Sequence, residues 1–125
     1  KDIYLPLICV MDNTLHWQKI SLQQLRNQRF ALHQLGMRQA MHHRGYLVKT
    51  LDVVIMPLVI FDNQGHRVGM GGGFYDRTLA QSLHKPVRIG YAHEFQRISK
   101  ILAVQPWDQN LDIVCTSKRY QRFKR

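Results

Sequence analysis

Two short apolar segments near the start of the chain have the pattern of neighbouring strands. Ile3–Val10 is apolar and contains Pro6, which favours a strand that has its proline at a sheet edge or strand end. Leu15–Ile20 alternates between apolar and polar positions, as strands with one buried face do. Because the turn-forming residues Asp12 and Asn13 separate the two segments, we expect that they can form an antiparallel hairpin.

The following segment has a weaker pattern. Ser21 can cap a short helix that extends to Leu32. Gly36 and Gly45 then interrupt any regular period, so we expect an irregular, basic connection over Leu35–Thr50.

The segment Leu51–Phe61, LDVVIMPLVIF, gives the strongest strand prediction in the chain. It is rich in β-branched residues and almost continuously apolar. Strands of parallel sheets that are buried on both faces have this pattern. We therefore expect this segment at the centre of the sheet.

Helices and strands alternate along the rest of the chain. A turn at Asp62–Gly65 and a glycine-rich loop precede a helix that we predict from Phe74 to about His84, with Pro86 ending it. The remaining predicted elements are a strand over Val87–Ala92, a short helix over Ile98–Val104 and a strand over Leu111–Thr116.

This alternation indicates an α/β fold. Such chains form a mainly parallel sheet with right-handed crossovers, and their ligands bind at the carboxyl ends of the strands. We expect a three-layer open sheet flanked by helices, with the antiparallel hairpin near the N-terminus. A length of 125 residues and a hydrophobic content of 45% fit one compact α/β domain over residues 1–125.

The charge of the chain favours anionic partners. Eighteen Lys and Arg residues against eight Asp and Glu residues leave a formal net charge of +10. Nucleic acid, nucleotide phosphates and a polycarboxylate ligand are all compatible with this charge. No acid occurs between Asn13 and Leu51, and the five cations of Lys118–Arg125 are typical of a solvated basic tail.

The sequence contains neither a membrane-helix pattern nor a signal-peptide pattern. No stretch approaches the roughly eighteen uninterrupted apolar residues of a membrane helix, and the opening residues KDIYLPLICV have no cleavage site. Cys9 and Cys115 have neither metal-site spacing nor the density of a disulfide framework. We therefore expect a soluble, cytoplasmic protein that has two buried thiols and no membrane partner.

The segment Gly65–Asp76, GHRVGMGGGFYD, is the strongest candidate for chemistry. Five of the eight glycines fall within its first nine positions, directly after the strongest strand and before a predicted helix. Glycines that adopt positive φ let successive N–H groups converge on an anion, and the helix N-terminus adds more N–H groups. We expect phosphate oxygens to bind here, with a tight connector as the alternative. The glycines concerned are Gly69, Gly71, Gly72 and Gly73.

Two common nucleotide motifs are absent from this loop. No Gly-Lys-Ser/Thr follows it, as a Walker A sequence requires, and Phe74 occupies the last glycine position of a dinucleotide fingerprint. Neither a P-loop ATPase nor a nicotinamide enzyme is supported. Arg67 can form a charge-assisted fork with a phosphate, and Asp76 can hold a magnesium ion between two phosphates. An ordinary helix N-terminal Asp explains Asp76 equally well.

A longer match extends over Leu51–Leu79. This run, LDVVIMPLVIFDNQGHRVGMGGGFYDRTL, resembles the core signature of 5-formyltetrahydrofolate cyclo-ligases, also called 5,10-methenyltetrahydrofolate synthetases. The shared order is an apolar strand ending in Phe-Asp, a Gly-x-Arg, a glycine cluster and an aromatic-Tyr-Asp-Arg. IGYAHEFQ at Ile89–Gln96 and QPWDQNLDIVCTSK at Gln105–Lys118 resemble the closing segments of the family, and KDIYLPL resembles its first strand more loosely.

The resemblance implies a ligase reaction. ATP phosphorylates the formyl oxygen of 5-formyltetrahydrofolate, the folate N10 attacks the activated carbon, and loss of phosphate leaves 5,10-methenyltetrahydrofolate. ADP and phosphate are the by-products. The implied partners are ATP, Mg²⁺ and 5-formyltetrahydrofolate, whose glutamyl tail the basic segment can attract. Phosphoryl-transfer enzymes mainly position their reactants and neutralise charge, and nucleic acid is not an expected partner.

The resemblance also implies roles for individual residues. Arg67 and Tyr75 are implied to be catalytic, and Asp76 and Asp108 to be magnesium ligands. The residues implied to line the ATP phosphates are Arg67, Val68, Gly69, Met70, Gly71, Gly72, Gly73, Phe74 and Tyr75. The residues implied to border the folate are Met70, Gly71, Gly72, Gly73 and Phe74.

The family's N-terminal part is not recognisable in this chain. The resemblance implies that a helical segment whose Lys and Arg reach the nucleotide lies outside it. Two kinds of function therefore stay open. One is the cyclo-ligase itself. The other is a binding module, either a non-catalytic homologue that keeps the nucleotide site or a basic nucleic-acid-binding protein.

Two histidine-containing segments have simpler explanations. We expect His42 and His43 in a solvated loop, because no acid accompanies them. His93 and Glu94 follow a predicted strand, and we expect them to stabilise a turn.

Overall fold

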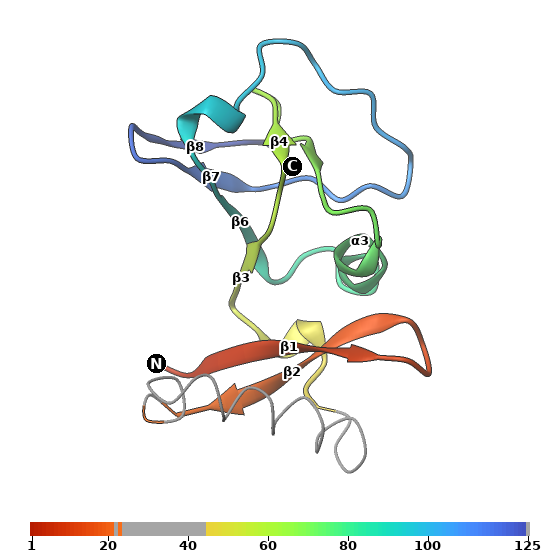
Figure 1. Cartoon of the computed structure of the whole chain (residues 1–125). Coiled ribbons are helices and arrows are strands. Elements are labelled where there is room, and N and C mark those ends of the chain that lie inside the picture. Colours follow the sequence, from red (N-terminus) through yellow and green to blue (C-terminus); the bar gives the residue numbers. More distant parts are fainter. Residues whose placement is uncertain (22, 24–44, 125) are drawn as a thin grey trace.

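A hairpin and a four-stranded sheet lie on opposite sides of helix α3 (Phe74–Leu79), as Figure 1 shows. The computed structural model describes residues 1–21, 23 and 45–124. The hairpin consists of β1 (Ile3–Cys9) and β2 (Thr14–Ile20), which pair antiparallel. The predicted hairpin is therefore confirmed. The helix predicted up to Leu32, and the segment with His42 and His43, fall outside the described residues apart from Ser21 and Gln23.

The four-stranded sheet has the order β3-β6-β7-β8. Its first three strands are parallel, and β8 pairs antiparallel with β7. The predicted α/β class with a mainly parallel sheet is confirmed. The C-terminal residues expected as a solvated tail instead supply this last edge strand. The four strands are β3 (Val53–Met56), β6 (Val87–Tyr91), β7 (Ile113–Cys115) and β8 (Tyr120–Arg122).

The apolar run Leu51–Phe61 forms two strands instead of one. β3 ends at Met56 because the following Pro57 has no N–H to donate to a ladder. The chain then forms β4 (Ile60–Phe61), which pairs antiparallel with β5 (Arg67–Val68) in a separate ribbon. Within the described residues β3 is an edge strand of its sheet. The prediction of one continuous central strand is wrong.

The described residues cover one face of the four-stranded sheet. Val54 and Met56 of β3 are buried, whereas Val53 and Ile55 point to the other face and are 48% and 56% exposed. Burial of β3 on both faces is therefore also a wrong prediction. On the covered face the sheet packs into one core, whose other fully buried members include Phe61, Leu79, Leu111 and Val114.

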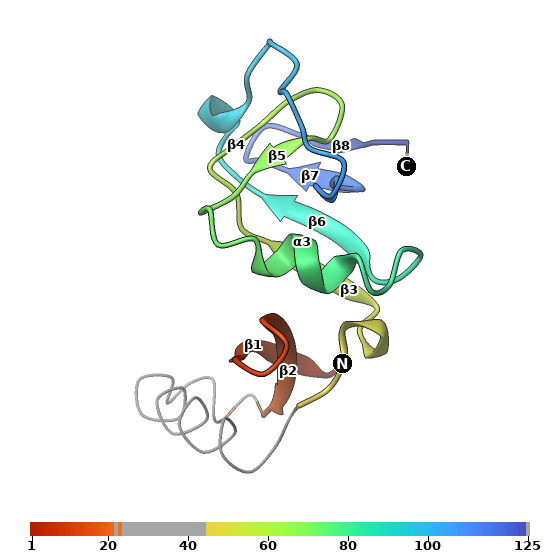
Figure 2. The ribbon, with the colours of Figure 1, turned by 90° about the vertical axis from the view of Figure 1, so that its right-hand side faces the viewer.

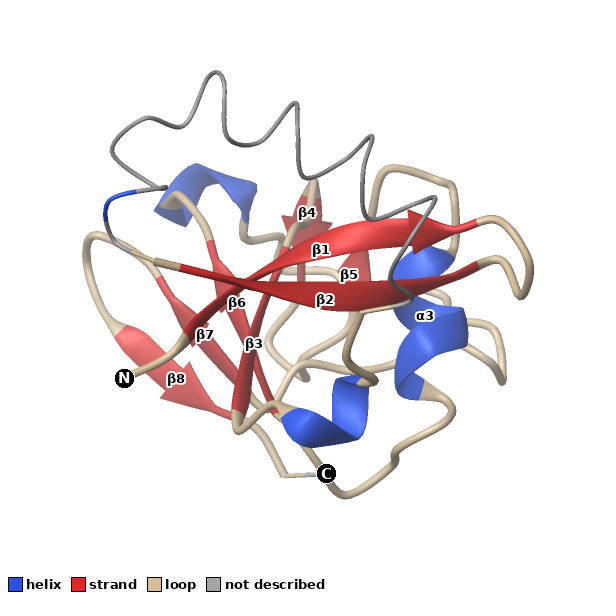
Figure 3. Cartoon of the chain, turned by 90° about the horizontal axis from the view of Figure 1, so that it is seen from below, coloured by secondary structure: helices blue, strands red, loops and turns tan. Residues whose placement is uncertain are grey.

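Helix α3 attaches the hairpin to the rest of the molecule. The Thr78 hydroxyl accepts a hydrogen bond from the Leu15 N–H at 2.8 Å and donates one to the Phe74 carbonyl at 2.6 Å. Arg77 Nε donates to the Asn13 carbonyl at 2.8 Å. Figure 2 shows α3 between the hairpin and β6, and Figure 3 shows it beside the end of the hairpin that carries the turn. Because these bonds come from both strand and turn, they fix the orientation of the hairpin.

Two predicted helical segments differ from the structure. α3 ends at Leu79 rather than near His84, and Ile98–Val104 is irregular rather than helical. The short helix that does form nearby is η2 (Glu94–Gln96), one turn of 3₁₀ helix, and a similar turn, η1 (Val48–Thr50), precedes β3. Among the described residues, no helix is long and apolar enough to cross a membrane.

The buried carboxylate of Asp62 organises the turn between β4 and β5. Its Oδ1 accepts the N–H groups of Gln64 and His66, and its Oδ2 accepts His66 Nδ1–H at 2.8 Å and the Leu102 N–H at 2.9 Å. Burial opposes ionisation of Asp62, but these hydrogen bonds outweigh it and hold the pKa below its usual range. The charged carboxylate thus fixes both the turn and the irregular segment around Leu102.

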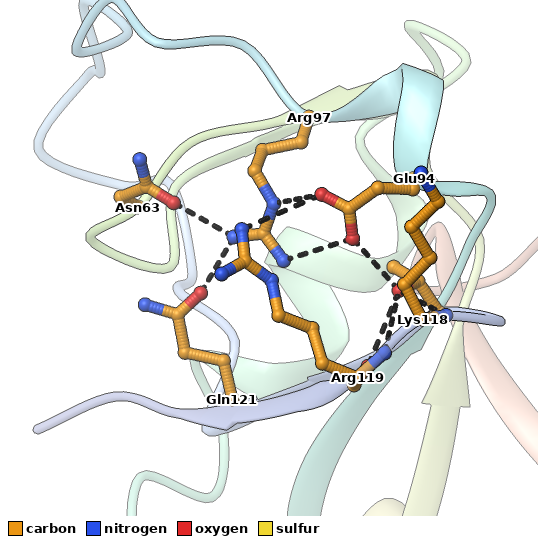
Figure 4. Close-up of polar contacts among 7 residues, drawn as sticks. Asn63, Glu94, Arg97, Lys118, Arg119 and Gln121 are labelled. Carbon is orange, nitrogen blue, oxygen red and sulfur yellow. Dashed lines mark hydrogen bonds and ion pairs between the residues drawn. The ribbon is translucent and has the colours of Figure 1, made fainter.

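Arg97 connects η2, the turn between β4 and β5, and strand β8 (Figure 4). Its Nε donates to Glu94 Oε2 at 2.6 Å, and its Nη1 donates to Asn63 Oδ1 at 2.7 Å and Gln121 Oε1 at 2.6 Å. Glu94 also accepts a hydrogen bond from the Thr116 hydroxyl at 2.8 Å. The expected turn-stabilising role of Glu94 is confirmed, because its bonds hold η2 to the β7–β8 hairpin.

The hydrogen bonds of Glu94 make the fold sensitive to acid. Those from Arg97 and Thr116 lower the pKa of Glu94 from an ordinary 4.5 to about 2. A carboxylate with a lowered folded-state pKa stabilises the fold fully above its unfolded value and loses that effect as the pH falls through the folded value. We therefore expect Glu94→Gln to lower the melting temperature at pH 7, and to flatten its decline between about pH 4.5 and pH 2.

Thermal melts followed by circular dichroism at several pH values measure this effect. Asp52→Asn is the matched control, because it removes an exposed ion pair with Lys85 that contributes little. Parallel pH profiles for Glu94→Gln and the unsubstituted chain would contradict the assignment.

Candidate functional site

The glycine loop connects β5 to α3 through two left-handed residues. Gly71 and Gly73 have φ values of 99° and 72°, so positive φ is confirmed at these two positions, while Gly69 and Gly72 do not adopt it. Gly73 is also the N-cap of α3. A Cβ at Gly71 would meet no atom within 4 Å. The backbone of the loop therefore faces open space at Gly71.

A cavity of about 770 Å³ lies against this loop. Its walls come from the loop, α3, the hairpin and the segment that follows Leu102. Every site residue predicted from the sequence lines this single cavity: Arg67, Val68, Gly69, Met70, Gly71, Gly72, Gly73, Phe74, Tyr75, Asp76 and Asp108.

The hairpin supplies an apolar wall that sequence reasoning missed. Pro6 and Ile8 of β1 and Leu15 of β2 line the cavity, and Ala103 and Trp107 line it from the opposite segment. Trp107 is 64% exposed at the cavity edge. No motif marks the hairpin residues, because they reach the cavity only through the packing of β2 on α3. Their one signal is the apolar alternation of the two strands.

Arg67 is a nearly buried cation in this cavity wall. Its side chain is 5% exposed, its Nη2 donates to Asp76 Oδ1 at 3.2 Å, and its Nη1 donates to the Pro57 carbonyl at 3.4 Å. Within the described residues its Nε has no hydrogen-bond partner. Burial lowers the pKa of Arg67, and the charges of Asp76 and Asp108 oppose that change. An arginine stays charged under these conditions, so the cavity has a fixed positive group.

Asp76 has a structural task that the sequence did not reveal. Its Oδ1 accepts hydrogen bonds from both Arg67 and the Gln109 N–H, the second at 3.0 Å. The carboxylate thus brings α3, β5 and the segment around Asp108 together. Neither alternative predicted for Asp76, a magnesium ligand or an ordinary helix N-terminal residue, includes this role.

Asp76 and Asp108 both offer carboxylate oxygens, the donors that Mg²⁺ prefers. Both carboxylates line the cavity beside the glycine loop, and both act on the charge of Arg67. Asp108 Oδ2 accepts the Gln105 N–H at 2.8 Å, which orients the side chain. Mg²⁺ is usually bound by one or two carboxylates together with substrate phosphates and water. The donor set therefore fits this ion.

The aromatic residues of α3 differ in their surroundings. Burial raises the pKa of the Tyr75 hydroxyl, and the charge of Arg67 opposes this change, so Tyr75 is a neutral phenol at physiological pH. Arg77 stacks over the Phe74 ring at 4.8 Å from its centroid. Met70, at the open side of the loop, is 85% exposed. The loop thus presents an exposed apolar side chain beside its backbone N–H groups.

The short α3 changes the origin of the expected anion binding. With six residues, this helix has a weaker dipole than the longer helix predicted from the sequence. Positive potential in the cavity therefore depends mainly on the Arg67 guanidinium and on the N–H groups of the loop itself.

Comparisons with known proteins identify relatives that match most or about half of this chain. The family model of 5-formyltetrahydrofolate cyclo-ligases matches residues 1–117. The 5-formyltetrahydrofolate cyclo-ligase of Escherichia coli K12 is 53% identical over 70 residues, which are 55% of this chain and 38% of that protein. The protein of the same name from Mycoplasma genitalium is 38% identical over 64 residues, or 51% of this chain and 38% of that protein.

A solved structure shows the same fold. A 5,10-methenyltetrahydrofolate synthetase from Mycoplasma pneumoniae superposes with a TM-score of 0.62 at 23% sequence identity, covering 90% of this chain and 54% of that one. The matches to the curated relatives above extend over 38% of their length. The match over residues 1–117, which includes the glycine loop and both carboxylates, means that the chain belongs to the 5-formyltetrahydrofolate cyclo-ligase family.

Proposed function

We propose that this chain carries the nucleotide-phosphate site of an enzyme that converts 5-formyltetrahydrofolate to 5,10-methenyltetrahydrofolate. In this reaction the formyl oxygen takes the γ-phosphoryl group of ATP, and ADP leaves. The folate N10 then attacks the activated formyl carbon, and the C–O bond breaks to release phosphate. The new C–N bond closes the five-membered ring.

The observation that carries this proposal is the position of Arg67 beside the open glycine loop. Its guanidinium is almost fully buried, and Asp76 and the Pro57 carbonyl engage its two Nη atoms. A buried charge needs partners of opposite sign or good hydrogen-bond acceptors. Phosphate oxygens in the cavity would give the Arg67 guanidinium a further negatively charged partner. They would also accept hydrogen bonds from the N–H groups of the loop.

Each residue of the site has a distinct task in this scheme. Arg67 and the loop N–H groups neutralise the charge that develops on the transferred phosphoryl group, which is the main contribution proteins make to this chemistry. Asp76 holds Arg67 in place. Tyr75, as a neutral phenol, can donate a hydrogen bond to a phosphate or formyl oxygen, while the loop residues Val68 to Gly73 shape the phosphate cradle.

Asp76 and Asp108 would hold Mg²⁺ at the edge of this cradle. A bound Mg²⁺ would offset the negative charge of the phosphates that this cradle holds. One oxygen of each carboxylate is already engaged, because Asp76 Oδ1 accepts hydrogen bonds from Arg67 and Gln109 and Asp108 Oδ2 accepts the Gln105 N–H. The second oxygen of Asp76 is the one that we assign to the ion.

The folate side of the cavity would be the apolar wall. Ile8 and Leu15 offer a surface on which a flat ring system can pack, and Met70 and Phe74 border the same space. Burial of apolar ring surface against such side chains favours binding. The net charge of +10 would attract the carboxylates of a glutamyl tail.

We also propose a single domain and a cytoplasmic location, where the free thiols Cys9 and Cys115 stay reduced.

Asp108→Asn tests the magnesium assignment. The amide oxygen can still accept the Gln105 N–H, so the fold should be kept, whereas a neutral ligand weakens Mg²⁺ binding. We expect the Mg²⁺ concentration for half-maximal turnover to rise by about 10- to 100-fold, as when metal sites lose a supporting group. Turnover is followed through the near-ultraviolet absorbance of the methenyl product, with ATP present and Mg²⁺ varied.

Asp52→Asn is the control for this experiment, because it makes the same substitution on an exposed side chain outside the cavity. An unchanged Mg²⁺ requirement in Asp108→Asn would refute the metal role. Absence of methenyl formation by the unsubstituted chain, with ATP binding retained, would favour a binding module over an enzyme.

Gly71→Ala tests the phosphate cradle separately from turnover. An alanine at the observed φ of 99° is strained, at a cost of roughly 1–3 kcal/mol. If the loop needs this backbone to bind ATP, the affinity should fall by roughly 5- to 150-fold. Calorimetric titration with ATP and Mg²⁺, without folate, measures the change.

The added methyl group at Gly71 meets no neighbouring atom, so loss of packing cannot explain a weaker complex. Equal ATP affinity in the two proteins would show that the cradle does not contribute to nucleotide binding.

A further inference from the structure

The turn of the hairpin holds a cluster of three potential metal ligands. Cys9 ends β1, Asp12 lies in the turn and His16 lies in β2. One ligand atom from each, the thiol sulfur, a carboxylate oxygen and an imidazole nitrogen, lies within 4.8 Å of the other two. These residues do not line the cavity of the candidate site. The sequence prediction missed them because it compared the two cysteines only with each other.

The strand register places these ligands together. Cys9 pairs with Thr14, and Leu7 pairs with His16. Alternate residues of a strand share a face, so Cys9 and His16 occupy diagonal positions on one face of the hairpin. Ile8 and Leu15, which line the cavity, are on the opposite face. The ligand cluster and the cavity therefore lie on opposite faces of the hairpin.

The turn directs Asp12 back onto the same face. Asn13 has a left-handed φ of 62°, and its N–H donates to the Cys9 carbonyl at 2.9 Å. Thr14 donates to Asp12 Oδ1 through its N–H at 3.1 Å and its hydroxyl at 2.6 Å. These bonds orient the carboxylate and leave Oδ2 toward His16, at 3.2 Å from its Nε2.

The cluster has the charge and access that a cation site needs. Hydrogen bonds from Thr14, His16 and the Cys9 thiol hold the pKa of Asp12 well below its usual range against its desolvation, so the carboxylate is charged at neutral pH. The His16 side chain is 9% exposed, whereas that of Asp12 is 46% exposed. An ion can thus enter from the Asp12 side and meet an imidazole that is already held in position.

We propose that Cys9, Asp12 and His16 bind one Zn²⁺ ion, with water as the fourth ligand. Zinc accepts sulfur, nitrogen and oxygen donors in tetrahedral sites, with metal–ligand distances of about 2.0–2.3 Å. Such ligands lie about 3.5 Å apart, and the ligand atoms here lie within 4.8 Å of one another, so each separation needs to shorten by at most roughly 1.3 Å. On binding, the thiol proton passes to solvent and the sulfur electron pair bonds to the ion.

The donor types distinguish this site from the magnesium site of the cavity. A thiolate and an imidazole suit zinc and related transition metals, whereas Mg²⁺ prefers oxygen donors alone. Thr14 supports the site from outside the ligand set, because it fixes the carboxylate in the orientation that the metal would use. The proposal does not depend on the cyclo-ligase reaction, since no ligand belongs to the catalytic cavity.

Cys9→Ser and Cys115→Ser form a matched pair for the test. Cys115 lies in β7, remote from the hairpin turn. We expect the unsubstituted chain and Cys115→Ser to bind one Zn²⁺ per chain in competition with a chromophoric chelator, without ATP or folate. Cys9→Ser should lose at least about tenfold in affinity, since even loss of a supporting outer group costs roughly 10–100-fold.

Co²⁺ supplies a second readout that reports on the sulfur directly. A thiolate ligand gives a near-ultraviolet charge-transfer band, which histidines elsewhere in the chain cannot produce. We expect this band in the unsubstituted chain and in Cys115→Ser. We expect Cys9→Ser to lack it. Asp12→Asn should keep the band and weaken the binding, and circular dichroism shows whether each variant is folded.

Two results would overturn the proposal. One is equal Zn²⁺ affinity in folded Cys9→Ser and the unsubstituted chain. The other is a cobalt spectrum without the charge-transfer band, or with a band that disappears in Cys115→Ser. Either result leaves the nucleotide site untouched, because ATP binding and turnover are measured separately.

Discussion

The ion pair between Arg67 and Asp76 is the interaction on which the site depends. Arg67 comes from the β4–β5 ribbon, Asp76 comes from the first turn of α3, and the same carboxylate oxygen accepts the Gln109 N–H. Because the guanidinium is 5% exposed, separating these segments would leave a buried charge without its partner, which is strongly unfavourable. One carboxylate therefore fixes the glycine loop at both ends and brings Asp108 to its side.

The sequence was sufficient where structure depends on local backbone chemistry. The Asp12-Asn13 turn between two apolar segments gave the hairpin, and the glycine cluster gave a loop with left-handed residues at Gly71 and Gly73. The family resemblance supplied Asp108, which no local pattern could have linked to the loop. Its position in the same cavity follows from the hydrogen bond between Asp76 and Gln109.

The failures of prediction occur where the environment decides. Apolar composition does not distinguish a strand buried on both faces from a short strand followed by a ribbon, and Pro57 was the neglected sign of a break. Because Leu83 lies four residues after Leu79, the sequence alone favours a helix that continues beyond the observed end of α3. In the structure Leu83 is 57% exposed. The buried Arg88 donates from its Nη2 to the carbonyls of Leu79 and Ser82. These carbonyls lie at and just after the end of α3, so a side chain takes the place of further helical N–H donors.

The hairpin contributes residues to both proposed sites, the cavity and the ligand cluster, but no residue belongs to both. One face of it forms the apolar wall of the cavity, and the other carries the cluster at its turn. Its position depends on Thr78 and Arg77, which bond to the backbone of Leu15 and Asn13. A metal bound at the turn would restrict the Asn13 backbone, and through Arg77 it would restrain the face that carries Ile8 and Leu15. In the proposed reaction, such a metal would affect folate binding by ordering the apolar wall and not by contacting the reactants.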